Sequence, residues 1–229
     1  MVFADLEPVD RESTPGIIAR RLREGIMNGT LPPGTQLGET ELASRFQVSR
    51  GPLREAMQRL VSEGLLHSER HRGLFVVDLE PSDVRDIYTA RTAIERAAVI
   101  EIMRGDRKQT AAALDETMWD MAQAAEKNDA TALSAADLKF HEVLIAASGS
   151  KRLVRMARTL LIETRMCLSR LQSTYRRVDE RVDEHNRIIR AIRQGDTDEV
   201  LALLEAHMLD AVQRLVPEPV GPEDQAAAA

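Results

Sequence analysis

Three histidines and one aspartate in the C-terminal part of this 229-residue chain stand at positions where helices would turn them inward. Asp137 and His141 are four residues apart and therefore lie one turn apart on one helix, while His185 and His207 belong to two further helices. For each residue alone, a hydrogen-bonded place in a polar core is an adequate explanation. Together they predict a divalent metal site, because several buried ionisable groups are costly unless paired or metal-bound. Three imidazoles and a carboxylate suit Zn best, and Ni, Mn or Fe are also compatible.

A second polar group interrupts the apolar stripe of the helix expected before this set. Arg91 and Glu95 are spaced i, i+4 in the middle of that stripe. One possibility is an internal ion pair, with Glu95 bridging to another helix. The other is that Arg91 receives an anionic effector beside the metal through its bidentate fork. Arg165, one turn before Ser169, is a weaker candidate of the same kind, so the predicted effector-binding residues are Arg91, Glu95 and Arg165.

The segment that carries these residues has only helical periodicity. No alternating apolar–polar run occurs between residues 79 and 215. Short breaks separate the expected helices, which favours an antiparallel all-α bundle. The first helix is expected to begin after Pro81, with Ser82 as its N-cap, and residues 216–229 are expected to be a disordered tail. The expected helices cover residues 82–103, 108–127, 130–147, 150–172, 177–194 and 197–215.

Residues 39–66 read as two helices joined by a tight turn over residues 46–48. Ser49 suits the N-cap of the second helix, and Pro52 falls in its first turn, where proline is tolerated. Arg50 and Arg54 lie one turn apart at the start of that helix. This layout is that of a helix-turn-helix, whose second helix enters the major groove, although an ordinary helical hairpin with a solvated basic face has the same turn length.

The flanking segments favour DNA binding. An amphipathic helix over residues 17–26 precedes the pair, and two short strands over 66–69 and 74–77 follow it, around the basic tip 70–73. Three helices and a basic hairpin form a winged helix-turn-helix, expected over residues 15–78 after a flexible arm over residues 1–14. The wing tip suits phosphate or minor-groove contacts.

Charge and composition limit the classes of function. The net charge is −6, which disfavours a general polyanion binder, whereas residues 15–77 hold nine Arg against six Glu, or +3. The single cysteine, Cys167, cannot form an internal disulfide, and a buried thiol is the expected role. We find no membrane-spanning run and no signal peptide. A cytoplasmic protein, associated with the nucleoid when bound to DNA, is therefore expected.

From about Pro15 to Leu215 the chain resembles the GntR family of bacterial transcription regulators, in its FadR-like branch with an FCD effector domain. The N-terminal matches are Leu31-Pro32-Pro33-Gly34, Leu37, Glu39, Leu42-Ala43, Val48-Ser49-Arg50, Pro52, Arg54-Glu55-Ala56, Leu60, Glu63-Gly64-Leu65 and Arg72-Gly73. The C-terminal matches are Arg91, Glu95, Asp137, Phe140-His141, Glu184-His185, Gly195-Asp196 and His207. Three positions depart from the family's pattern. Gly51 stands where threonine is common, Met57 where leucine is usual, and Ser150 where asparagine is frequent.

The resemblance implies a homodimer that binds a short inverted repeat in double-stranded DNA. It also implies an all-helical domain that binds metal and usually a small carboxylate. Position by position, it assigns the metal to Asp137, His141, His185 and His207, and DNA contacts to Arg45, Arg50 and Arg54. With the helix start and the wing tip, the predicted DNA-binding residues are Arg45, Ser49, Arg50, Gly51, Arg54, Arg72 and Gly73.

These observations predict a repressor controlled by a small carboxylate or hydroxy-acid effector. We expect the effector to bind beside the metal with help from Arg91, and to change the spacing of the two DNA-binding wings. Two alternatives remain at this point. One is a metal-dependent enzyme acting on small carboxylates, and the other is a regulator that responds to acyl-CoA without a metal.

Overall fold

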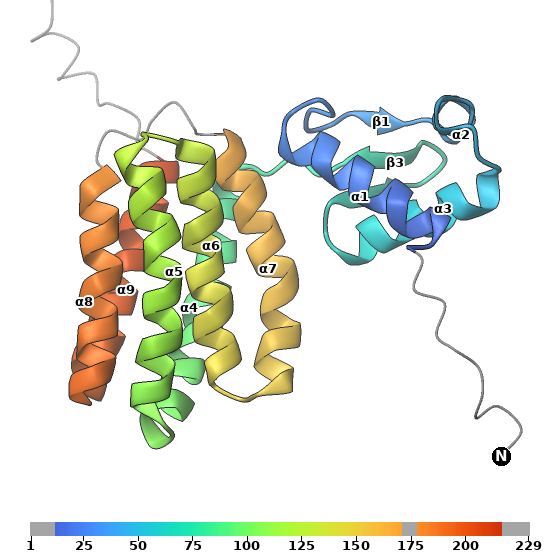
Figure 1. Ribbon diagram of the computed structural model, residues 1–229. Coiled ribbons are helices and arrows are strands. Elements are labelled where there is room, and N and C mark those ends of the chain that lie inside the picture. The colour runs from blue at the N-terminus through green and yellow to red at the C-terminus, as the bar shows by residue number, and fades with distance from the viewer. Residues whose placement is uncertain (1–11, 171–177, 217–229) are drawn as a thin grey trace, which may run out of the picture. The chain divides into compact units, whose positions relative to one another are not determined.

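A computed structural model of the chain describes residues 12–170 and 178–216, and it divides into two compact units between Asp78 and Leu79. The N-terminal unit contains three helices and a small sheet, and the C-terminal unit contains helices (Figure 1). The arm expected over residues 1–14 and the tail expected over residues 216–229 fall mainly on residues 1–11 and 217–229, which lie outside the described residues.

The N-terminal unit has the order of elements of a winged helix-turn-helix. Its elements are α1 (Thr14–Met27), β1 (Gln36–Leu37), α2 (Glu39–Phe46), α3 (Arg50–Ser62), β2 (Leu66–Glu69) and β3 (Gly73–Val76). The three strands are antiparallel in the order β1-β3-β2. The two-residue strand β1 was not predicted, because two residues carry no readable alternation. It pairs Gln36 with Phe75 and adds a third strand to the wing hairpin.

The turn between α2 and α3 has the compactness that its length predicts. Gln47 has φ 55°, so the chain reverses through one left-handed residue. Ser49 occupies the N-cap position of α3, although its hydroxyl makes no capping hydrogen bond. Leu53 and Leu60 of α3 are fully buried, and α3 packs against α1. The apolar stripe therefore faces the interior and leaves the opposite side of α3 exposed.

α1 begins within the segment that was expected to be a flexible arm. Thr14 is its first residue, and the hydroxyl of Ser13 accepts a hydrogen bond from the Gly16 N–H at 3.2 Å. This cap satisfies one of the free N–H groups of the first turn and so fixes the helix start.

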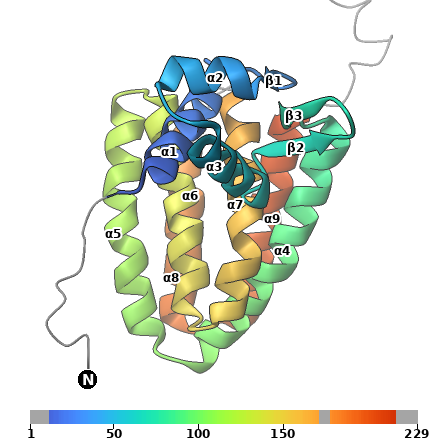
Figure 2. The ribbon, with the colours of Figure 1, turned by 90° about the vertical axis from the view of Figure 1, so that its right-hand side faces the viewer.

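The C-terminal unit is an antiparallel bundle, which confirms the mainly helical fold class. Its helices are α4 (Pro81–Arg104), α5 (Arg107–Glu126), α6 (Ala130–Ala147), α7 (Lys151–Arg170), α8 (Val178–Gln194) and α9 (Thr197–Leu215). Each packs against the next around the closed ring α4–α7–α6–α5–α8–α9, and α4 also contacts α6 across it. Figure 2 views this bundle with α6 and α7 towards the viewer, between α5 and α4.

The expected cap of α4 was wrong by two residues. The helix begins at Pro81 with Glu80 as its N-cap, and Asp83 accepts the Glu80 N–H at 2.8 Å. Proline is favoured at the first helical position because its missing N–H would have no partner there. Ser82 therefore lies inside the first turn instead of capping it.

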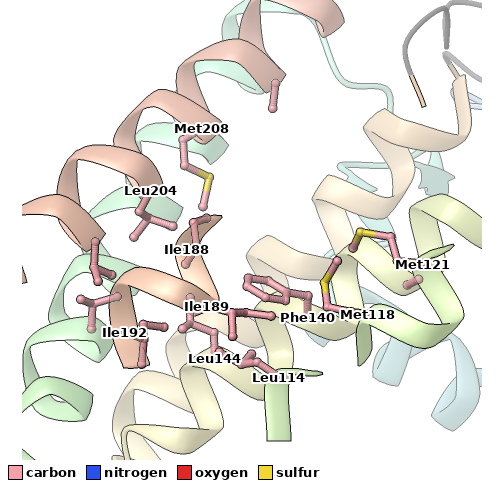
Figure 3. Packing of buried hydrophobic residues seen from close by; sticks show 14 of the residues in the cluster. Leu114, Met118, Met121, Phe140, Leu144, Ile188, Ile189, Ile192, Leu204 and Met208 are labelled. Atoms are coloured by element: carbon pink, nitrogen blue, oxygen red, sulfur yellow. The ribbon is translucent and has the colours of Figure 1, made fainter. Parts of the chain in front are cut away.

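Phe140 lies at the centre of the bundle's larger apolar cluster. Its ring is fully buried and stands between methionines of α5 and isoleucines of α8 (Figure 3). A smaller apolar cluster lies between α4, α6 and α7, where Ala98, Leu138 and Leu161 are buried. None of the helices in the described ranges is long and apolar enough to cross a membrane.

Candidate metal centre

Four side chains from three helices converge inside the bundle. Asp137 and His141 lie on α6, His185 on α8 and His207 on α9, and all four are buried. Each offers one ligand atom, and these four atoms all lie within 4.8 Å of one another. The structure thus brings together the four residues that the sequence predicts as metal ligands.

Each histidine has its Nδ1 atom held by another group. Nδ1 of His141 lies 2.6 Å from Oε2 of Glu95 on α4. Nδ1 of His207 lies 3.0 Å from Oε2 of Glu184, and Nδ1 of His185 lies 2.8 Å from the main-chain oxygen of Arg181. Since these acceptors favour a proton on Nδ1, each Nε2 keeps its lone pair for another partner.

The Nε2 atoms point to a common place. Those of His141 and His207 are 3.2 Å apart, and Nε2 of His185 lies 3.5 Å from Oδ1 of Asp137. Nε2 of His185 is buried and has no hydrogen-bond partner within the part of the chain that the structure describes. A buried polar atom without a partner is costly in an ordinary polar core. It fits the chemistry of a metal ligand, so the residues present suit a divalent transition metal.

The charge states of these groups also suit a cation. Burial lowers the pKa of His185 to about 3, and burial also lowers the pKa of His141, so both imidazoles are neutral near pH 7. Burial acts to raise the pKa of Asp137, but the facing Arg181 and the histidines outweigh it and hold that pKa below its usual range. A carboxylate and neutral imidazoles are the protonation states that ligate metals.

Arg91 and Glu95 form the buried ion pair that the sequence allowed. Oε1 of Glu95 accepts from Nε and Nη2 of Arg91 at 3.1 and 3.0 Å, and Nη1 of Arg91 lies 3.4 Å from the Thr164 hydroxyl. The guanidinium also lies over the Tyr88 ring, 5.0 Å from its centroid. Because Oε2 of Glu95 contacts His141, the bridge from Glu95 to a second helix is present as well.

Arg165 does not join this group. Its side chain is exposed on α7 and lines a groove between α6 and α7. The described residues that line the groove include none of the four candidate ligands.

The sequence analysis assigned no role to two residues around the centre, Arg181 and Glu184. Arg181 is 5% exposed, and its Nη1 atom lies 3.7 Å from Oδ1 of Asp137. Its position one turn before His185 on α8 was the available signal, but its partner lies on another helix. Glu184, which also binds Arg214 at 3.0 Å, adjoins His185 in sequence yet orients the histidine of α9.

The predicted DNA-contact residues are all exposed on the N-terminal unit. They lie at the end of α2, at the start of α3 and at the wing tip, and are Arg45, Ser49, Arg50, Gly51, Arg54, Arg72 and Gly73. Nε of Arg54 donates to Oε2 of Glu39 at 2.8 Å, and Nη2 of Arg50 donates to the Thr40 hydroxyl at 3.2 Å. Arg50 and Arg54 are thus held by side chains at the start of α2.

The wing tip is a tight turn with two left-handed residues. His71 has φ 63° and Gly73 has φ 103°, a conformation that favours glycine. The Gln36 side chain donates to the main-chain oxygen of Arg72, and the Arg72 guanidinium lies 5.0 Å from the centroid of the Phe75 ring. These contacts anchor the tip while leaving its basic side chains at the surface.

Comparison with known proteins gives two family matches. Residues 16–76 match the bacterial regulatory proteins of the gntR family, and residues 86–210 match the FCD domain. The gluconate operon transcriptional repressor of Bacillus licheniformis is 30% identical over 207 residues, which cover 88% of this chain and 85% of the repressor. The transcriptional repressor GlaR of Escherichia coli is 28% identical over 205 residues, covering 84% and 91%.

A crystal structure of a transcriptional regulator of the GntR type from Rhodococcus sp. RHA1 has a similar fold. It aligns with a TM-score of 0.77 and 26% identity over 90% of this chain and 99% of that one. The matched families and relatives are transcription regulators and not enzymes, which removes the enzyme alternative. With a winged helix-turn-helix and an FCD bundle in one chain, this protein belongs to the GntR family of DNA-binding transcription regulators.

Proposed function

We propose that this regulator is a homodimeric repressor that binds a short inverted repeat, and that a small carboxylate or hydroxy acid bound at a divalent metal releases it. The metal is held by the carboxylate of Asp137 and the Nε2 atoms of three histidines, with Zn preferred over Ni or Mn. The observation that carries the proposal is the buried Nε2 of His185, which has no hydrogen-bond partner among the described residues.

Three protein groups orient the histidines that are proposed to bind the metal. Glu95, Glu184 and the Arg181 carbonyl hold the histidine rings so that every Nε2 is presented to one place. Fixing the tautomer and the ring orientation in this way raises metal affinity. When bound, a divalent metal supplies positive charge and open coordination positions for an oxygen ligand.

The charge balance of the centre favours an anionic effector. The buried charges Arg91, Arg181, Glu95 and Asp137 cancel one another, and the histidines with lowered pKa are neutral. A divalent cation therefore adds two positive charges that these groups do not compensate. Because an uncompensated buried charge is costly, a carboxylate co-ligand would stabilise the loaded centre.

We assign Arg91 and Glu95 to the side of the centre that binds the effector. Arg181 is the second cationic side chain there. Hydrogen bonds to Glu95 and Thr164 already fix the guanidinium of Arg91. Arg91 therefore needs little reorganisation to bind the carboxylate of an effector. A hydroxy acid also agrees with the Bacillus licheniformis relative, which is named as the repressor of a gluconate operon. A metal-free acyl-CoA regulator is disfavoured because it would leave the buried cluster without a role.

For effector binding to release DNA, the effector must bind more tightly to the form of the dimer that does not bind DNA. Allosteric coupling typically changes the affinity at the second site fivefold or more. Contacts from α4, α6, α8 and α9 meet at the centre, so a change there acts on four of the bundle's helices at once. The resulting change in spacing between the two wings would prevent both recognition helices from binding successive major-groove sites.

The test uses a duplex selected from randomised DNA by the full-length protein. Metal-loaded protein is titrated by fluorescence anisotropy with gluconate, lactate, citrate and acetate, and with glycerol as an uncharged control. We expect at least one acid to weaken DNA binding about fivefold or more. His185→Ala should abolish this response while retaining DNA binding, and Arg187→Ala, an exposed change on the same helix, should keep it. An equal response in His185→Ala would contradict the proposal.

A further inference from the structure

A groove lies between α6 and α7, and its described lining residues include no candidate metal ligand. Its volume is about 410 Å³, within the range of roughly 300–1,000 Å³ of small-molecule sites. Its floor is the outer side of the smaller apolar cluster and is formed by the buried side chains Leu138, Ile145, Ala157 and Leu161. A cavity of this size with an apolar floor suits the apolar part of a ligand.

Cationic side chains stand along the rim of this groove. Arg158 and Arg165 of α7 and Lys139 of α6 all line it. Lys139 lies 3.6 Å from the carboxylate of Glu142, but neither arginine has an ion-pair partner in residues 12–170 or 178–216. The two arginines are seven positions apart in sequence, so they stand two turns, or roughly 10 Å, apart on one face of α7. An apolar floor beneath two uncompensated guanidinium groups is complementary to an anion with an apolar body.

From this combination we propose that the groove binds an amphiphilic anion, such as a medium-chain aliphatic or an aryl carboxylate. The chain of the ligand lies between α6 and α7 over Leu138 and Leu161, and its carboxylate pairs with Arg158 or Arg165. The site is independent of the proposed metal centre, since the described lining residues include no candidate metal ligand.

A second copy of the protein is a poorer occupant of the groove. A two-fold interface centred there would bring the same patch of both chains together. Arg158 and Arg165 of one chain would then face the same arginines of the other, and like charges directly opposed in an interface are unfavourable. A small anion instead neutralises the charge that the groove presents.

The probe is decanoate, titrated calorimetrically into the full-length protein, with decanol as the uncharged control. We expect one saturable site per chain for decanoate and at least about tenfold weaker binding of decanol, because each charge-assisted hydrogen bond contributes roughly tenfold or more in affinity. Arg158→Ala combined with Arg165→Ala should weaken decanoate binding at least about tenfold. Arg155→Ala, an exposed arginine of α7 that does not line the groove, is the matched control and should change nothing.

Two further variants distinguish ligand binding in the groove from binding at the metal centre and from a dimer interface. Ala146→Phe places a large side chain at the exposed edge of the groove without altering its floor and should abolish decanoate binding. His185→Ala should leave decanoate binding unchanged, because the metal centre is a separate site. Absence of decanoate binding, or equal binding by all variants, would overturn the proposal. Conversion of a dimer to monomers by Ala146→Phe would do so too, because it would show that a second copy covers the groove.

Discussion

Oε2 of Glu95 lies 2.6 Å from Nδ1 of His141, while Oε1 of the same carboxylate accepts two hydrogen bonds from Arg91. One buried side chain on α4 therefore orients a candidate metal ligand on α6 and neutralises an arginine on its own helix. Burial acts to raise the pKa of Glu95, but His141 and Arg91 outweigh it and keep that pKa below its ordinary value. The carboxylate is consequently charged near pH 7.

Glu95→Gln should weaken metal binding while leaving the four ligands in place. The loss of negative charge behind His141 lowers the basicity of its Nε2, and changes of this kind typically cost 10–100-fold in metal affinity. Competition with a chromophoric chelator would measure the affinity. Glu205→Gln, which alters an exposed ion pair with Arg96, is the control and should have no effect. Unchanged metal affinity in Glu95→Gln would show that Glu95 serves only Arg91.

The metal-free protein should lose stability in acid, in part through His185. Its pKa is about 3 in the folded chain and near 6.5 in the unfolded chain. The unfolded chain thus binds this proton more readily, so the contribution is fully present above about pH 6.5 and falls as the pH drops from 6.5 towards 3. Thermal unfolding of chelated protein between pH 7 and pH 4 would measure this loss. His185→Gln removes the titrating group and should flatten the profile, whereas an equally steep profile would assign the loss to other groups.

Arg54→Ala should reduce specific DNA binding more than non-specific binding. Its Nε is held by Glu39, which leaves the two Nη groups to meet a base edge, and the loss of such a bidentate contact costs about 1–3 kcal/mol. Anisotropy titrations on the selected duplex and on a scrambled one would compare the two losses. Arg59→Ala, at the far end of α3, should lower neither by much. Equal losses on both duplexes would make Arg54 a phosphate contact.

Two glycines of the DNA-binding unit should respond oppositely to alanine. Gly51 lies in α3 with open space where a Cβ would stand, so Gly51→Ala should stabilise the unit by about 0.5 kcal/mol. Gly73 has φ 103°, so Gly73→Ala should destabilise it by about 1–2 kcal/mol. Denaturant unfolding of both variants would measure the difference, and the same sign for both would contradict the assigned conformations.

Much of the fold follows from local patterns in the sequence. The helix ends beside four of the breaks of the bundle were expected within one residue, because glycine, asparagine or aspartate marks each of these breaks. The helix end expected at 172 and the helix start expected at 177 lie outside the described residues. The start of α4 was misplaced because Pro81 can both end one element and begin another. Strand β1 escaped prediction because two residues contain no period, and only pairing with β3 defines it.

The candidate centre was predictable in its ligands but not in its surroundings. Asp137 and the three histidines stand out because each interrupts an apolar stripe. The roles of Arg181 and Glu184 depend on which helices are neighbours, and helical periodicity carries no information on that. The sequence placed Arg165 in a helical pattern like that of Arg91. In the structure its side chain is exposed and lines the groove between α6 and α7.

The most direct test of the central proposal is elemental analysis of the purified full-length protein, before and after chelation, for the natural sequence and for His185→Ala. His67→Ala removes an exposed histidine outside the centre and is the matched control, while circular dichroism verifies that each variant is folded. We predict about one Zn, Ni or Mn per chain in the natural protein and in His67→Ala, and a clear loss in His185→Ala. A folded natural protein that retains no metal after incubation with each of these ions would contradict the proposed metal centre.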